Sequence, residues 1–203
     1  MQEDIKSAFD PKTQSQSLSS KILVALERIA EAFKVSLWEE SKKNQLSPIQ
    51  VQILIFLQFH SPEKNKVSYL AQEFNVSKAT ISDAIKALLA KNLIFKEIEA
   101  DDSRSYKIFL SEKGQKMAKD CATLSNKFEQ AISQISDNQQ ITFFENLFQL
   151  ISHLNQTGIV SVQRMCLNCC YHQLDAQRHY CNFLNTPLKI NELRIDCEEH
   201  QAT

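Results

Sequence analysis

The sequence predicts a mainly α-helical protein in which two short helices are followed by a β-hairpin, and three observations support this. Apolar residues repeat at helical spacing on both sides of a break at Asn75-Val76. Ser77 stands where the second helix needs an N-terminal cap. Farther along, the apolar spacing changes from about 3.6 residues to about 2, in two runs at 94–98 and 105–110. Two helices and a hairpin in this order form a winged helix-turn-helix.

The segments before this motif predict a mobile arm and two helices. Residues 1–17 are polar and show no apolar period, which is typical of a mobile N-terminal arm. From 18 to 45, apolar residues recur three or four positions apart, so we expect one long helix. Another helix begins at Ser47-Pro48, where a capping serine precedes a proline and Gln50 can complete a capping box. We interpret His60, in the sequence His60-Ser-Pro62, as the residue that ends this helix.

The second helix of the central pair has two chemically different faces. Ile81, Ala84, Ile85 and Leu88 form an apolar stripe, and small, hydroxylic and cationic side chains lie opposite. Such side chains let a helix approach a DNA groove closely and offer donors to phosphates and base edges. An ordinary amphipathic helix pair would show the same stripe. The β-hairpin that follows the pair in the sequence is what favours DNA binding. The predicted DNA contacts on this helix are Ser77, Lys78, Thr80, Ser82, Asp83 and Lys86.

Two further helices are expected after Gly114, which closes the hairpin. Residues 115–135 place their apolar side chains on one face, and Ser136 and Asp137 indicate a new helix start. The helix that follows, over 140–155, is apolar almost all round. Such a helix must be covered on several sides. We therefore expect a second copy of the chain to cover one of them, as a homodimer.

Three stretches, at 46–57, 67–94 and 101–114, resemble the MarR family of bacterial transcription regulators. The similarity covers roughly residues 19–156. The resemblance implies a dimer built on the first and last helices that binds operator DNA, usually as a repressor. It also implies that Arg104, held by Asp102 at the tip of the hairpin, reaches the minor groove.

The chain departs from the family pattern at two positions. Asp83 stands where relatives often carry arginine, and Ser103 replaces a frequent basic residue. Both departures bear on DNA affinity more than on the fold. The resemblance also implies an effector, either a small aromatic acid or an oxidant sensed by a thiol, but no residue of this chain is assigned to it.

Composition and charge limit the possible partners. The chain has 203 residues, a formal net charge of −1 and two glycines, which argues against a glycine-rich phosphate loop. Basic and acidic residues nearly balance between 63 and 113, so DNA affinity must depend on a few cations presented in two copies. No apolar run is long enough to span a bilayer and no signal-peptide core opens the sequence. We expect a cytoplasmic protein with no membrane partner.

The segment after Gly158 contains most of the six cysteines of the chain. Cys166-Leu-Asn-Cys169 is a knuckle that brings two thiolates to one side, and Cys197-Glu-Glu-His200 can do the same. Disulfides are disfavoured in a reducing cytosol, so a bound metal is expected, which would also hold this small segment folded. The predicted metal ligands are Cys166, Cys169, Cys181 and Cys197, with His200 as substitute and Cys170 as a spare.

Four thiolates suit zinc, the default metal for a structural role, and they equally suit an iron–sulfur cluster. An enzyme built on this metal would need a general base, for which Glu198 or Glu199 could be nominated, but no His-Glu-x-x-His or deaminase-type motif accompanies them. We therefore do not expect an enzyme. A protein–protein docking module on a winged-helix scaffold is the alternative to a DNA-binding regulator.

The sequence thus predicts three regions. Residues 1–17 form the mobile arm, and 18–157 form the winged-helix domain for DNA binding and dimerisation. Residues 158–203 form the cysteine-rich metal-binding module.

Overall fold

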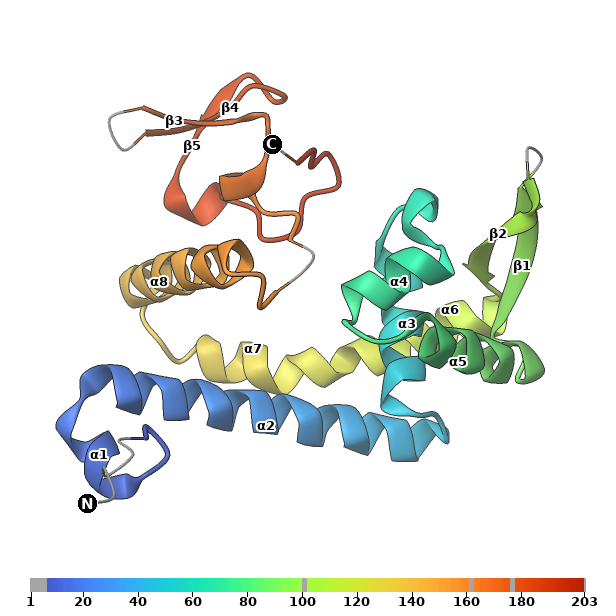
Figure 1. Ribbon diagram of the computed structural model, residues 1–203, viewed down its shortest axis with the longest axis horizontal. Helices are drawn as coiled ribbons and strands as arrows, with labels where there is room; N and C mark the ends of the chain where they lie inside the picture. The colour runs from blue at the N-terminus through green and yellow to red at the C-terminus, as the bar shows by residue number, and fades with distance from the viewer. Residues whose placement is uncertain (1–6, 100–101, 161–162, 176–177, 203) are drawn as a thin grey trace, which may run out of the picture. The chain divides into compact units, whose positions relative to one another are not determined.

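The computed structural model describes residues 7–99, 102–160, 163–175 and 178–202, and excludes the side chains at 99 and 102–104. The chain divides into two compact units, Met1–Val51 and Gln52–Thr203. Figure 1 shows the order of their elements. The predicted boundaries of the N-terminal arm, near residue 17, and of the cysteine-rich module, near residue 157, stay predictions.

The first unit consists of helices α1 (Pro11–Gln16) and α2 (Leu18–Asn44) and the start of α3 (Pro48–Phe59). Ser17 caps α2 by accepting a hydrogen bond from the Ser20 amide, and Gln45 ends it in the left-handed conformation, with φ of 53°. The long predicted helix is therefore present. Helix α1 lies inside the segment expected to have no periodic structure; Asp10 caps it through the amides of Lys12 and Thr13.

The second unit contains the winged helix. After α3 come a 3-10 turn η1 (Pro62–Lys64), helices α4 (Val67–Glu73) and α5 (Lys78–Ala90), and strands β1 (Ile94–Glu99) and β2 (Asp102–Leu110). Asn75, with φ of 50°, makes the turn between α4 and α5. The strands pair antiparallel from Ile94 opposite Leu110 to Ile98 opposite Tyr106. The apolar stripe of α5 is buried in the core beneath the wing, together with Ile53, Leu54, Leu70 and Ile108.

Helix α6 (Glu112–Ala122) follows the wing and is fixed to it at its first turn. Ser111 caps α6 by accepting from the Gly114 amide and donates its hydroxyl to the carbonyl of Asn92 at 2.8 Å. Gly114 itself leaves no room for a side chain, because a Cβ there would lie 1.8 Å from the carbonyl oxygen of Leu93. The glycine is therefore needed for the close approach of α6 to the chain before β1.

The helix expected over 115–135 begins earlier and is interrupted. A 3-10 turn η2 (Thr123–Ser125) separates α6 from α7 (Asn126–Ile132). The hydroxyls of Thr123 and Ser125 bond back to the carbonyls of Asp120 and Ala122, at 2.7 and 3.3 Å. Such back-bonding competes with the helical hydrogen-bond ladder and tightens the turn. Helix α8 (Asp137–Gln156) then begins where Ser136 and Asp137 predicted.

The C-terminal segment folds as a small module with a sheet of its own. It contains 3-10 turns η3 (Cys166–Asn168) and η4 (Ile190–Glu192) and strands β3 (His172–Asp175), β4 (Arg178–Cys181) and β5 (Thr186–Leu188). The strands form an antiparallel sheet in the order β3-β4-β5.

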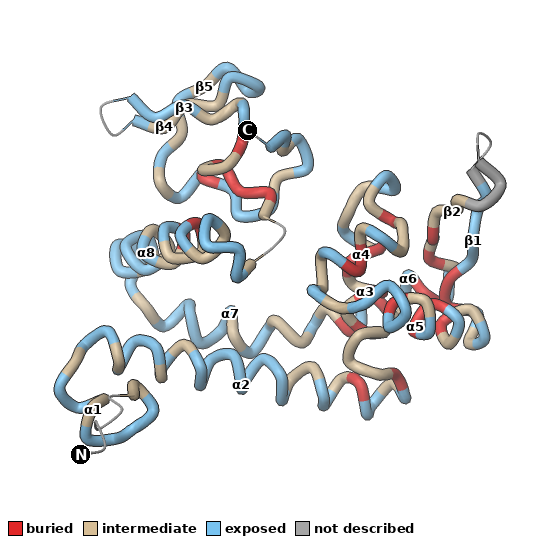
Figure 2. Tube along the Cα trace, in the orientation of Figure 1, coloured by how far each residue is buried: buried red, intermediate tan, exposed pale blue. Residues whose placement is uncertain are grey.

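Helix α8 and this module share one apolar cluster. Phe148 of α8 is buried with Met165, Cys166 and Leu193 of the module. Figure 2 shows buried segments, in red, both in α8 and in the module. Part of the apolar surface of α8 is thus covered by the chain's own C-terminal module. Phe143, however, stays 41% exposed. Among the described residues, no helix is both long and apolar enough to cross a membrane.

Candidate nucleic-acid interface and cysteine cavity

Helix α5 presents the predicted DNA-contacting face to solvent. Lys78, Thr80, Asp83 and Lys86 are exposed and Ser82 is half-buried, whereas the apolar stripe on the other side is buried. The exposed Ser77, just before the helix, accepts a hydrogen bond from the Thr80 amide at 3.1 Å, so it caps the end that would enter a groove first. The structure therefore brings all six predicted residues of this helix to one accessible face or its edge.

Asp83 and Lys86 form an ion pair on this face. The Lys86 ammonium lies 2.9 Å from a carboxylate oxygen of Asp83, and both side chains are about three-quarters exposed, at 73% and 75%. Exposed pairs of this kind contribute little to stability, typically about 0–1 kcal/mol. A phosphate group would therefore compete for Lys86 at low cost, while Asp83 would oppose the approach of the DNA backbone.

The wing tip, where the minor-groove contact was predicted, lies mostly outside the described side chains. Arg104 and Asp102 belong to β2, but their side chains are not among those that the structure describes. Below the tip, the Lys96 ammonium lies 4.0 Å from the centre of the Tyr106 ring, and Lys107 pairs with Glu63 at 3.9 Å. The Asp102–Arg104 pair stays a prediction.

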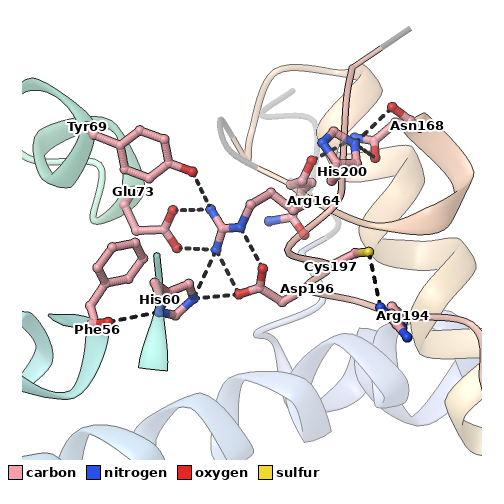
Figure 3. A network of polar contacts seen from close by, with 11 residues as sticks. Phe56, His60, Tyr69, Glu73, Arg164, Asn168, Arg194, Asp196, Cys197 and His200 are labelled. Atoms are coloured by element: carbon pink, nitrogen blue, oxygen red, sulfur yellow. Dashed lines mark hydrogen bonds and ion pairs between the residues drawn. The ribbon is translucent and has the colours of Figure 1, made fainter. Parts of the chain in front are cut away.

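A buried guanidinium, which the sequence did not reveal, connects the cysteine module with the helix-turn-helix (Figure 3). Arg164 is only 9% exposed and donates to both oxygens of Asp196, at 2.5 and 2.7 Å. On its other side it donates to Glu73 at 2.7 and 3.2 Å and to the Tyr69 hydroxyl at 2.8 Å. His60 completes the network, because its Nε2 lies 2.8 Å from Asp196.

This network shifts the titration of its two central groups. Burial disfavours the charge of Asp196, but hydrogen bonds from Arg164 and His60 outweigh it and hold the pKa of that carboxyl well below its usual range. Hydrogen bonding to Asp196 and Glu73 likewise raises the pKa of Arg164 despite its burial. Both groups are therefore charged at any physiological pH.

The network attaches the module to α4, the first helix of the helix-turn-helix, because Tyr69 and Glu73 lie on α4. His60, at the end of α3, also bonds the carbonyl of Phe56 at 3.0 Å and stacks on the Phe56 ring. His60 does end its helix as expected, but its ring also contacts Asp196, which lies 136 positions farther along the chain. The one local sign in the sequence is that Arg164 and Asp196 each lie within two residues of a predicted metal ligand.

The four predicted cysteine ligands line a single cavity of about 240 Å³ in the module. Cys166 begins η3 and Cys169 follows it, Cys181 ends β4, and Cys197 directly follows the bridge residue Asp196. The rest of the lining combines aromatic and aliphatic side chains with a few polar ones: Tyr171, His172, Phe183, Leu184, Leu188, Glu192, Arg194 and Glu199.

The two substitute ligands lie elsewhere. Cys170 is exposed, with its sulfur 3.9 Å from an oxygen of Gln201, and His200 Nε2 lies 3.0 Å from the Asn168 carbonyl oxygen.

Hydrogen-bond donors from Arg194 point at two of the cavity sulfurs. Its amide donates to Cys166 at 3.2 Å and its guanidinium to Cys197 at 3.6 Å. Burial nevertheless raises the pKa of the Cys166 thiol, and the other three thiols add to this effect. Within the described ranges, no three His, Cys, Asp or Glu side chains are placed to hold one metal ion together. The cysteines therefore surround a hollow rather than a single point.

Comparisons with known proteins agree with this fold. Residues 44–105 match the model of the MarR family. The crystal structure of an S. aureus MepR–DNA complex is similar with a TM-score of 0.57 and 22% identity, over 64% of this chain and 96% of that chain. A MarR transcriptional regulator from Methanosarcina mazei Go1 is similar with a TM-score of 0.56 and 22% identity, over 68% and 97% of the two chains. No curated protein matches the sequence. The likeness to the MarR family therefore covers the winged-helix part of the chain, and the two similar solved structures share its fold.

Proposed function

We propose that the protein is a homodimeric, sequence-specific DNA-binding transcriptional regulator that acts as a repressor. The observation that carries this is the solvent-facing surface of α5, whose donors stand on a helix held rigidly by four buried apolar residues. A rigid helix with exposed short polar and cationic side chains is what major-groove recognition requires. The similar MepR structure in complex with DNA supports the same use of the fold.

The residues of α5 divide into two roles. Lys78 and Lys86, as point charges, contact phosphates and fix the register of the helix on the duplex. Thr80 and Ser82 are short enough to reach base edges once the helix is seated. Asp83 accepts from the amino group of a cytosine, which makes it a source of specificity at the expense of affinity. Arg104 at the wing tip reaches the flanking minor groove.

Dimerisation is supported by the apolar surface of α2. Leu18 is 73% exposed, Ile22 51% and Trp38 56%. Apolar side chains of this size, repeated along one helix, favour burial against a second copy. A two-fold dimer would present its α5 helices to successive major-groove turns, roughly 34 Å apart. It would also double the few phosphate contacts that a chain of net charge −1 can offer.

A protein–protein docking module is the second candidate. The observation in its favour is the apolar outer surface of the wing, where Ile98 is 71% and Phe95 42% exposed. A wing used only for phosphate contact would not need these side chains.

Fluorescence anisotropy with a labelled duplex from upstream of the protein's own gene tests the proposal. We expect salt-sensitive binding to this duplex, with an affinity higher than that for an unrelated duplex of equal length. Lys78→Ala and Lys86→Ala should weaken binding to both duplexes, whereas Thr80→Ala should reduce the difference between them. Failure to bind any duplex at low ionic strength would contradict the proposal and favour the docking module.

A further inference from the structure

We infer that the four-cysteine cavity holds an iron–sulfur cluster rather than the single zinc ion that is the default for a structural role. The decisive observation is the size of the site. A zinc ion needs its four ligand atoms about 2.3 Å from one point, which would bring the sulfurs within about 4 Å of one another. In the described residues no three donors are gathered that closely, yet all four thiols line the same hollow of about 240 Å³.

That volume suits a polyatomic centre. A single water-sized sphere needs only roughly 10–15 Å³ of such space, so the cavity of about 240 Å³ has room for a group of several atoms. Clusters of iron and sulfide are bound by four cysteine thiolates and fill the space between them. Four cysteines around a hollow therefore match a cluster in number and in chemistry.

Backbone hydrogen bonds bring the cysteine-bearing segments to the cavity. The amide of Cys166 donates to the Arg194 carbonyl at 3.0 Å, and the amide of Cys197 donates to the Arg164 carbonyl at 2.9 Å. Cys181 pairs with His172 across the β3–β4 sheet. Three separate segments are thus held around one cavity.

The surroundings of the sulfurs also suit a cluster. The two N–H donors of Arg194 point at Cys166 and Cys197, and such N–H···S bonds are a principal means by which proteins tune cluster potential. Phe183, Leu184 and Leu188 line another part of the same cavity.

The cluster would be linked to the helix-turn-helix through Arg164, a step that rests on the proposed function. Arg164 and Asp196 pair in an isolated β-bridge, and each lies within two residues of a cavity cysteine. The opposite side of the Arg164 guanidinium is bonded to Tyr69 and Glu73 of α4. Loss of the cluster would release the segments around Cys166 and Cys197, loosen this pairing, and lower the affinity for DNA.

Anaerobic purification of the full chain tests the cluster directly. We expect a brown protein that absorbs near about 400 nm and contains iron and acid-labile sulfide in equal amounts. Cys181→Ser should lose the iron while keeping its circular dichroism, and Cys166→Ser should behave likewise if it folds. Cys170→Ser and Cys121→Ser are the matched controls and should keep the iron. Stoichiometric zinc without iron, or no metal at all, would overturn the inference.

The linkage is tested by comparing the DNA affinity of cluster-loaded protein with that of protein from which iron has been removed by a chelator. We expect at least about a fivefold loss of affinity, and Arg164→Met should abolish the difference between the two forms. Equal affinity of the two wild-type forms would overturn the linkage. If neither form binds DNA, the proposed function fails, but the iron and sulfide contents still decide the cluster.

Discussion

Replacing Arg164 with methionine should destabilise the second unit by about 2–3 kcal/mol. Methionine keeps an apolar stem of similar length beside the Phe56 and Tyr69 rings, which lie 5.9 and 6.0 Å from the guanidinium carbon. The substitution therefore removes the charge and its hydrogen bonds but little packing.

The size of this destabilisation depends on how deeply Glu73 and Asp196, the two carboxylates that face Arg164, are buried. Breaking a buried ion pair costs about 3–5 kcal/mol, because the remaining charge is left without compensation. Here Glu73 is 18% exposed, but Asp196 is 43% exposed, so water screens the second carboxylate and reduces the cost. For a unit of this size the expected shift of the unfolding midpoint is roughly 5–10 °C.

Urea unfolding followed by circular dichroism, at one fixed metal content, measures this effect. The double variant Arg164→Met with Glu73→Gln should recover about 1 kcal/mol, because it removes one of the two facing carboxylates. Lys86→Ala, which removes an exposed cation, is the control and should change stability by less than about 0.5 kcal/mol. An Arg164→Met variant as stable as the wild type would refute the view that this guanidinium holds the module to α4.

Four further outcomes are expected. The pKa of Asp196 is lowered on folding, so its stabilisation is complete above the unfolded pKa of about 3.9 and is lost as pH falls. The stability difference between the wild type and Asp196→Asn, from urea titrations, should therefore narrow from about pH 5 to about pH 2; a constant difference would contradict this assignment. Gly114→Ala should cost more than about 2 kcal/mol, since its Cβ would lie 1.8 Å from the Leu93 carbonyl oxygen, and an unchanged unfolding midpoint would argue against that close approach. Asp83→Ala should strengthen binding to an unrelated duplex severalfold in anisotropy titrations, because it frees Lys86 from a contact of 2.9 Å, and should reduce the preference for the specific duplex; an unchanged preference would contradict the base contact of Asp83. Ile22→Glu should convert a dimer into a monomer in sedimentation velocity runs, and an unchanged sedimentation coefficient would place the dimer contact elsewhere.

The helix-turn-helix was predictable because several local patterns coincide there. The cap at Ser77, the stripe from Ile81 to Leu88 and the alternation in the two strands each act over a few residues, and each is present in the structure. The interruption of α6 at Thr123 was missed because hydroxyl back-bonding in this turn overrides a continuous apolar face. Helix α1 was missed although Asp10-Pro11 carries a recognisable cap and first-turn proline.

The cysteine module shows the limit of such reasoning. The Cys-x-x-Cys knuckle and the later cysteines identified the residues that line the cavity, but spacing gave no information on its width. The Arg164 network could not be foreseen, since Arg164 and Glu73 are 91 positions apart and no repeating pattern links them. The shared apolar cluster of α8 and the module was likewise hidden, because an apolar helix face does not reveal what will cover it.

Hydroxyl-radical footprinting of the protein on the DNA upstream of its own gene tests the central claim most directly. Two copies of α5, presented by a two-fold dimer, should protect two half-sites whose centres lie about one helical turn apart. Lys78→Ala should weaken both half-sites equally. Protection of a single half-site, or of no defined sequence at low ionic strength, would contradict the account.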